Sequence, residues 1–402
     1  MAPDIRHADA AAIAAALGEL RAHTLRLFAA WRTLLPPSMD VRYAPELNPP
    51  RWELGHLAWF EERWIARNPA RLRGAAADPD AGRAAPLRPA VDALYDSSHV
   101  AHTRRWHLDL PDADATLAYA AQVRQRSLAL LADLPAGDDA LYFPRWALLH
   151  EAMHAEASVY MAQHLALDLS PALARSRPAA SDLGGDWALP GGPFSLGHAG
   201  PGFAFDNELG AHEVDLAPFA IARAPVTWRE VLAFVEAGGY DDERLWSPQG
   251  WAWRRRQGAA RPGTLAQDDG TWRRAAFGHW LDLLPTEPAV HLTQHEALAW
   301  CRWAGRRLPT EAEWECAAIT AQASGEAFAW GEVWEWTAST FAPYPGFQPH
   351  PYRDYSMPWF DGRPVLRGAS FATWPALRNP RYRNYFPAER NDIFAGFRTC
   401  AA

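Results

Sequence analysis

Apolar positions in the first 170 residues recur at the spacing of amphipathic helices. The pattern predicts helices over about 8–34, 51–66, 91–107, 112–133 and 143–167. Pro36 and Pro37 end the first of them, and Asn48-Pro49-Pro50 precedes the second. The stretch from 70 to 90 is rich in Ala, Pro, Gly and Arg and is predicted as a loop. Together these elements predict an up-and-down bundle of four main helices.

The pattern changes after residue 172. Residues 173–187 lack periodicity and are predicted as a linker, and short β-like segments broken by Gly and Pro follow from Gly191. Further helices are predicted at about 227–237, 293–304 and 310–320, whereas 325–402 shows loop signals almost throughout. The chain is therefore predicted to be α+β with two domains, a helical bundle over 1–172 and a loop-rich domain over 188–402.

Composition narrows the class of protein. The 402 residues include 21 tryptophans, most of them after residue 225, and such chains form loop-rich folds held by aromatic packing. The net charge of −8 and the lack of a basic tract argue against binding to nucleic acid. The three cysteines, Cys301, Cys316 and Cys400, argue against a disulfide framework and for a reducing compartment. No signal-like N-terminus or membrane-length apolar run is evident, so we expect a cytoplasmic protein without a membrane partner. The oligomeric state stays open, with a monomer as one candidate.

Three histidines form a candidate metal site. His150 and His154 are four residues apart within a predicted helix, so both imidazoles lie on one helical face. His56 lies on another predicted helix among apolar residues, and helical bundles bring such side chains together in their interior. Three nitrogen ligands would leave coordination positions open for substrate and O2. That arrangement suits Fe(II) better than a closed structural zinc site.

The same residues allow other interpretations. The string His150-Glu151-Ala152-Met153-His154 also satisfies the H-E-x-x-H pattern of zinc proteases, in which the glutamate is the general base. A zinc-dependent thiol transferase would share the three histidines but would not need the second domain. A lectin-like carbohydrate-binding module would leave the histidines unexplained. The role of a further group, His99, His102 and His107, stays open because its spacing straddles helical faces.

Several strings in the chain resemble a known family. Gly55-His56-Leu57-Ala58-Trp59-Phe60, followed by His150, His154 and Glu156, resembles the DinB-type domain of the ergothioneine-pathway sulfoxide synthases. The second half resembles the formylglycine-generating-enzyme-like domain, a variant of the C-type lectin fold. The strings that carry this second resemblance include Phe205-Asp206-Asn207-Glu208, Trp246-Ser247-Pro248-Gln249-Gly250-Trp251, Val333-Trp334-Glu335-Trp336-Thr337 and Ala395-Gly396-Phe397-Arg398.

The resemblance implies a fold, a cofactor and a reaction. The fold would be a DinB-like four-helix bundle followed by a C-type-lectin-like domain. The cofactor would be Fe(II), held by His56, His150 and His154, with O2 as co-substrate. The reaction would join sulfur or selenium to the imidazole ring of hercynine, which is trimethylhistidine. In the string Tyr352-Arg353-Asp354-Tyr355, Tyr352 would be the catalytic tyrosine that supplies a proton or an electron, and Tyr355 would line the imidazole pocket.

One segment departs from the family pattern. Members that use γ-glutamylcysteine have Asn-Trp-Asp with an arginine four residues later, whereas this chain has Asn384-Tyr385-Phe386 with Arg390. A phenylalanine cannot accept a hydrogen bond from an ammonium group. Other strings, Asp40-Val41-Arg42-Tyr43-Ala44-Pro45 and Leu94-Tyr95-Asp96-Ser97-Ser98, are similar to a neighbouring branch, the selenoneine synthases, which take selenium from a seleno-sugar. The resemblance thus implies a seleno-sugar donor bound by Asn384, Tyr385, Phe386 and Arg390. The alternative is a hercynine sulfoxide synthase that uses cysteine or γ-glutamylcysteine.

Overall fold

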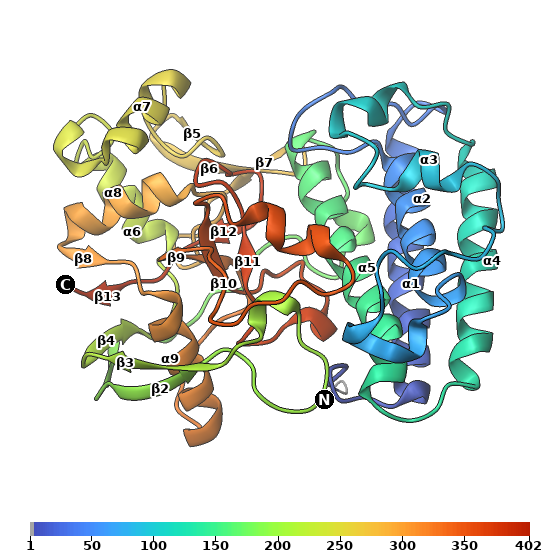
Figure 1. Cartoon of the computed structure of the whole chain (residues 1–402). Helices are drawn as coiled ribbons and strands as arrows, with labels where there is room; N and C mark the ends of the chain where they lie inside the picture. Colours follow the sequence, from blue (N-terminus) through green and yellow to red (C-terminus); the bar gives the residue numbers. More distant parts are fainter. Residues whose placement is uncertain (1–3) are drawn as a thin grey trace.

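The computed structural model describes residues 4–402 and consists of a helical part and a part that contains four sheets (Figure 1). The predicted α+β class with two domains is confirmed. The first three residues of the predicted domain 1–172 lie outside the described residues. Among residues 4–402, no helix combines the length and the apolar character that a bilayer crossing requires.

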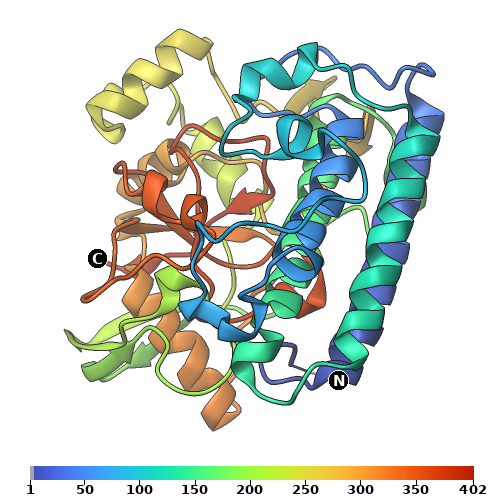
Figure 2. The same cartoon turned by 45° about the vertical axis from the view of Figure 1, so that its right-hand side comes forward.

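Four long helices form the N-terminal bundle, as the periodicity predicted. They are α1 (Ala10–Leu34), α2 (Pro50–Glu61), α4 (Ala113–Ala132) and α5 (Asp138–His164). The N-termini of α1 and α4 are capped by aspartates, because Asp9 accepts from Ala12 N–H and Asp112 accepts from Ala115 N–H. Figure 2 shows α1 and α4 along the edge farthest from the second domain, and both views place α5 on the side that faces it.

The predicted helix over 91–107 is wrong as a single element. Its first part is the short helix α3 (Val91–Tyr95), and a 3₁₀ turn follows at His102–His107. Between them, the side chain of Asp96 accepts from Ser98 N–H at 3.0 Å. Asp and Ser side chains compete in this way with the helical hydrogen bonds of the backbone, so the helix ends here. The predicted loop from 70 to 90 contains a 3₁₀ segment, Arg71–Ala76.

The second domain is built from short strands and four helices. The predicted helices are present as α6 (Trp228–Glu236), α8 (Gln294–Ala304) and α9 (Glu311–Ser324). A further helix, α7 (Pro248–Gln257), was missed because its arginine-rich sequence has no apolar stripe. The first strand, β1, begins at Asp186, inside the stretch 173–187 that was predicted as a linker.

The strands form four sheets. One has the order β1-β4-β13-β8, with β1 (Asp186–Leu189), β4 (Phe219–Ala222), β8 (Arg306–Arg307) and β13 (Cys400–Ala401). A second has the order β11-β10-β9-β12, with β9 (Trp334–Thr340), β10 (Pro364–Gly368), β11 (Asn384–Tyr385) and β12 (Ala395–Gly396). Two smaller sheets pair β2 (Gly192–Leu196) with β3 (His212–Leu216), and β5 (Leu265–Asp268), β6 (Thr271–Ala276) and β7 (His279–Asp282).

Local signals predicted that the tail from 325 to 402 is almost all loop, and this prediction is wrong. It supplies every strand of the sheet β11-β10-β9-β12, in which β10 is antiparallel and β12 parallel to β9. The partners of β9 lie far along the chain, so no local pattern reveals the pairing. Residues 334–337 of β9 are buried on both faces, which removes the alternation expected of a half-exposed strand.

Candidate metal centre and substrate pocket

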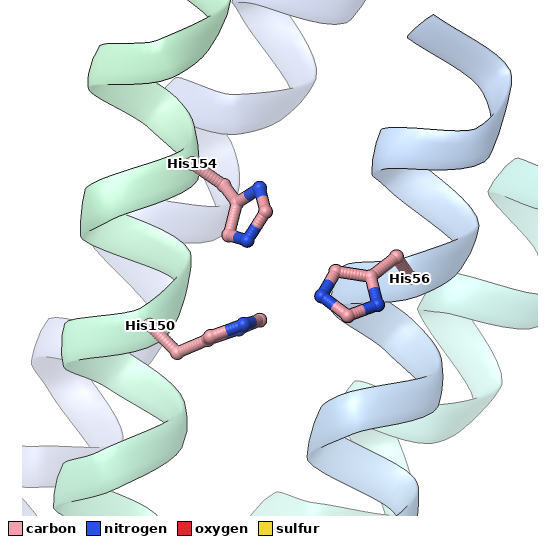
Figure 3. Close-up of side chains that lie close together, drawn as sticks. All are labelled: His56, His150 and His154. Carbon is pink, nitrogen blue, oxygen red and sulfur yellow. The ribbon is translucent and has the colours of Figure 1, made fainter. Parts of the chain in front are cut away.

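Three histidines from two bundle helices meet in the interior of the protein. His56 lies in α2, and His150 and His154 lie one turn apart on α5. One ring nitrogen of each lies within 4.8 Å of the others, and Figure 3 shows the three rings around a common space between the helices. His56 is 2% exposed and His150 is 4% exposed. The structure therefore brings together the three residues that the sequence predicted as metal ligands.

The surroundings of each ring leave a nitrogen free to face that space. His56 donates from Nδ1 to the carbonyl of Tyr95 at 2.8 Å, and His154 Nδ1 lies 2.5 Å from a carboxylate oxygen of Glu53. In both residues Nε2 remains available for a metal ion. The His150 ring stacks on Phe60, with 3.7 Å between ring centroids.

Burial also favours the neutral imidazole, which is the form that binds metal. It lowers the pKa of His56 to about 3 and the pKa of His150 well below its usual range. Among residues 4–402, this trio forms the one group of His, Cys, Asp or Glu side chains close enough to share an ion. Three imidazole nitrogen donors fit Fe(II), and they also fit a catalytic Zn(II).

Glu151, the glutamate of the H-E-x-x-H pattern, is turned away from this centre. Its carboxylate accepts from Arg21 Nε at 2.8 Å and from Arg124 Nη2 at 2.6 Å, and both arginines also pair with Glu61. These partners lie on α1, α4 and α2 and are buried with it. A general base must reach a metal-bound water, and this carboxylate is held elsewhere. The zinc-protease interpretation therefore fails on geometry.

A cavity of about 560 Å³ separates the bundle from the second domain beside this centre. Met153, Glu156 and Tyr160 of α5 line one side, next to the histidines in sequence. The opposite wall includes all five residues predicted to bind substrate, which are Tyr355, Asn384, Tyr385, Phe386 and Arg390. The predicted residues thus share one pocket, although their roles stay predictions.

Tyr352 lies close to the histidines but not on the wall of this cavity. Its ring centroid is 6.3 Å from that of His150 and 5.1 Å from that of Phe60. The hydroxyl lies 3.4 Å from Ser97 Oγ. Burial raises the pKa of Tyr352 to about 12, so the phenol keeps its proton near neutral pH. A protonated hydroxyl at this place can serve as a proton donor.

Arg390 is already paired, which the sequence did not reveal. Its Nε and Nη2 lie 2.5 Å and 2.6 Å from the two carboxylate oxygens of Asp392. Its guanidinium also lies 5.0 Å from the ring centroid of Phe386. In the sequence, the only sign of this ion pair was that Arg390 and Asp392 are two residues apart. The positive charge that Arg390 presents to the pocket is therefore largely neutralised by Asp392.

The second histidine group does not converge on one ion. His102 donates from Nε2 to the carbonyl of Leu47 at 2.7 Å, and it lines the cavity. His99 is exposed and lies 3.1 Å from Asp96, and His107 is also exposed. The three cysteines are free thiols.

Comparison with known proteins agrees with this architecture. Residues 19–167 match the DinB superfamily, and residues 172–332 match the family described as sulfatase-modifying factor enzyme 1-like domain. The chain is 36% identical to the hercynine oxygenase of Mycolicibacterium smegmatis, over 89% of this chain and 92% of that protein. It is 35% identical to the hercynine oxygenase of Mycobacterium tuberculosis, over 96% and 97%. It is also 39% identical to the formylglycine-generating enzyme of Streptomyces coelicolor, over 37% of this chain and 51% of that protein.

The fold and the comparisons define a two-domain oxygenase-type enzyme, with a DinB-like bundle and a formylglycine-generating-enzyme-like domain. The chain belongs to the hercynine oxygenase family. The predicted relationship to the sulfoxide synthases is confirmed at this level.

Proposed function

We propose that this protein is a non-haem iron enzyme that uses O2 to join a chalcogen, sulfur or selenium, to the imidazole ring of hercynine. The observation that carries the proposal is the trio His56, His150 and His154, with nitrogens within 4.8 Å, beside a cavity of about 560 Å³. The names of the relatives support hercynine as substrate. Iron held by the three histidines would supply the activation of O2.

The cavity suits a substrate that carries a quaternary ammonium group. Aromatic rings of Tyr160, Trp334, Tyr355 and Tyr382 line it, and the carboxylate of Glu156 lies among them. Trimethylammonium groups are attracted to the faces of such rings, and a nearby carboxylate adds to the attraction. Hercynine would bind here, with Tyr355 against its imidazole ring. The ring would then lie beside α5, where Met153 and Glu156 line the cavity next to His154 in sequence.

The remaining residues would orient the reactants and manage protons. Tyr352 holds its proton at neutral pH and lies near His150, so we assign it the catalytic role of proton donor. Phe60 and Trp146 pack edge-on against its ring, with centroids 5.1 Å and 5.5 Å away, and this packing fixes the direction of the hydroxyl. Bulky aromatic side chains on this side also keep water from the reacting atoms.

For the donor, we propose a seleno-sugar. The ammonium and carboxylate groups of γ-glutamylcysteine would need an acceptor at position 386 and a free arginine at 390. The chain offers a phenylalanine and an arginine paired with Asp392. A neutral, hydroxyl-rich donor can stack on Phe386 and Tyr385 and hydrogen-bond to Asn384. The second candidate is a sulfur donor, cysteine or γ-glutamylcysteine, and the family membership of the chain favours it.

The test is a competition between donors. Enzyme loaded with Fe(II) without O2 would receive hercynine, then O2 with a seleno-sugar, its thio-sugar analogue, cysteine and γ-glutamylcysteine together. Mass spectrometry would identify the product. A hercynine–selenium adduct from the seleno-sugar alone is expected. A sulfoxide from cysteine or γ-glutamylcysteine would assign the sulfur reaction instead.

The metal is tested on the same sample. Elemental analysis should find one equivalent of iron in the active protein, and none in the His154→Ala variant, which should also be inactive. Full activity with zinc alone would overturn the oxygenase proposal and return the thiol transferase as the explanation.

A further inference from the structure

A buried carboxylate stands directly behind one of the three histidines. Glu53 lies on α2, three residues before His56, and its Oε2 is 2.5 Å from Nδ1 of His154 on α5. One turn of α2 thus carries the predicted ligand His56 together with Glu53, the hydrogen-bond partner of the predicted ligand His154. Glu53 is 7% exposed, so water does little to screen its charge.

The partners of the three histidines differ in charge. His56 is held by a neutral backbone carbonyl, that of Tyr95, and His150 is held by stacking on Phe60. Among the described residues, a carboxylate partner is found for His154 and not for the other two. A carboxylate that accepts from Nδ1–H fixes the ring orientation and directs the Nε2 lone pair outward. Its negative charge also makes that nitrogen a stronger donor to a metal ion.

The other carboxylate oxygen of Glu53 is free to take a second partner. Within residues 4–402, Oε1 has no hydrogen-bond partner although it is fully buried. Glu53 lines a cavity of about 30 Å³ inside the bundle, whose other walls include Leu27, Leu57 and Met161. That space is enough for about one water molecule. The carboxylate therefore has room to complete its hydrogen bonding without leaving His154.

We propose that Glu53 is a positioning residue of the metal centre, which locks His154 in the ligating orientation and raises its affinity for a divalent ion. The inference rests on the proposed function, because it assumes that the three histidines hold a metal. It adds a fourth side chain to the centre, one that does not touch the ion. Loss of such a partner lowers metal affinity by roughly tenfold to a hundredfold.

The experiment is a metal titration of the whole protein without O2, with Fe(II) and with Co(II), whose visible spectrum reports the geometry of its ligands. Glu53→Leu should bind both ions roughly tenfold to a hundredfold more weakly than the wild type and should shift the Co(II) bands. Glu53→Gln should fall between the two, because its amide oxygen can still accept from Nδ1–H but carries no charge.

Glu62→Gln is the matched control. Glu62 is a fully buried acid just after α2, and it accepts from Leu87 N–H and from the Tyr119 hydroxyl, both at 2.7 Å. Its variant should lose stability but keep the wild-type metal affinity and Co(II) spectrum. The comparison separates an effect on the metal centre from a general effect of neutralising a buried acid.

Each outcome decides the question. Metal affinity within twofold of the wild type in both Glu53 variants would overturn the inference. If Glu53→Leu does not fold, Glu53→Gln decides alone, since unchanged affinity and unchanged Co(II) bands would overturn the inference. Failure of the wild type to bind either ion would instead overturn the proposed function, and the inference with it.

Discussion

Glu156 joins the two domains, and its replacement by alanine is expected to loosen the pocket that lies between them. The residue is on α5 and is 5% exposed. Its carboxylate accepts three hydrogen bonds from the second domain, from Trp334 Nε1 at 2.8 Å, Ser370 Oγ at 2.5 Å and Thr373 Oγ1 at 2.7 Å. The three donors come from β9 and from the turn that follows β10.

The cost of the substitution follows from the donors left behind. A buried donor without a partner costs about 1–3 kcal/mol, so three would cost about 3–9 kcal/mol. Water can enter the space that the side chain vacates and replace part of the lost bonding. We therefore expect Glu156→Ala to lower the free energy of unfolding by about 3–5 kcal/mol. Glu156→Gln keeps one carbonyl oxygen as an acceptor and should lose about 1–2 kcal/mol.

Urea unfolding of the metal-free protein, followed by tryptophan fluorescence, measures the effect. Trp334, a partner of Glu156, is one of the 21 tryptophans that contribute to the signal. The exposed Glu19 provides the control, and Glu19→Gln should change the free energy by less than about 0.5 kcal/mol. A Glu156→Ala variant within about 1 kcal/mol of the wild type would refute the view that this carboxylate links the domains.

Three more variants test other parts of the structure. A Cβ at Gly55 would lie 2.2 Å from the Tyr95 ring. Gly55→Ala should therefore lower the free energy of unfolding by about 1–3 kcal/mol and weaken metal binding. A variant that binds metal as tightly as the wild type would contradict this prediction. Burial lowers the pKa of His291 to about 4, so below pH 6.5 the unfolded chain takes up a proton that the native state refuses. Stability should therefore fall between pH 6.5 and pH 4 by on the order of 3 kcal/mol from this residue, and thermal unfolding of His291→Asn across that range should show a flatter profile. If the pH profile of His291→Asn matches that of the wild type, His291 is not the source of the loss of stability at low pH. Phe386→Asp should raise kcat/KM for γ-glutamylcysteine at least about tenfold, because the new carboxylate beside Arg390 can accept from the ammonium group of that donor. An unchanged kcat/KM would refute the view that Phe386 sets the choice of donor.

The helices of the bundle could be predicted from the sequence because their stabilising patterns are local. Helical hydrogen bonds join residues four apart, and the apolar spacing of α1, α4 and α5 marks the buried face directly. The same periodicity placed His150 and His154 on one face. Where a local side chain competes for the backbone, as Asp96 does after α3, the prediction of one long helix was wrong.

The resemblance of whole strings supplied what periodicity could not. The strings around Trp246 and Trp334 indicated the second domain, although its sheets were hidden by short strands with distant partners. A separate string, Tyr352-Arg353-Asp354-Tyr355, indicated the two tyrosines, of which the structure places Tyr352 near the histidines and Tyr355 on the cavity wall.

By itself, the sequence determined the helical bundle, the two-domain α+β organisation and the identity of the three histidines. Only the tertiary structure decided which charged side chains pair with one another. Glu151 is held by Arg21 and Arg124, Arg390 is held by Asp392, and Glu53 is turned toward His154. The physical reason is that helical order depends on neighbours along the chain, whereas the role of a buried charge depends on whichever opposite charge or donor the fold brings within about 3 Å.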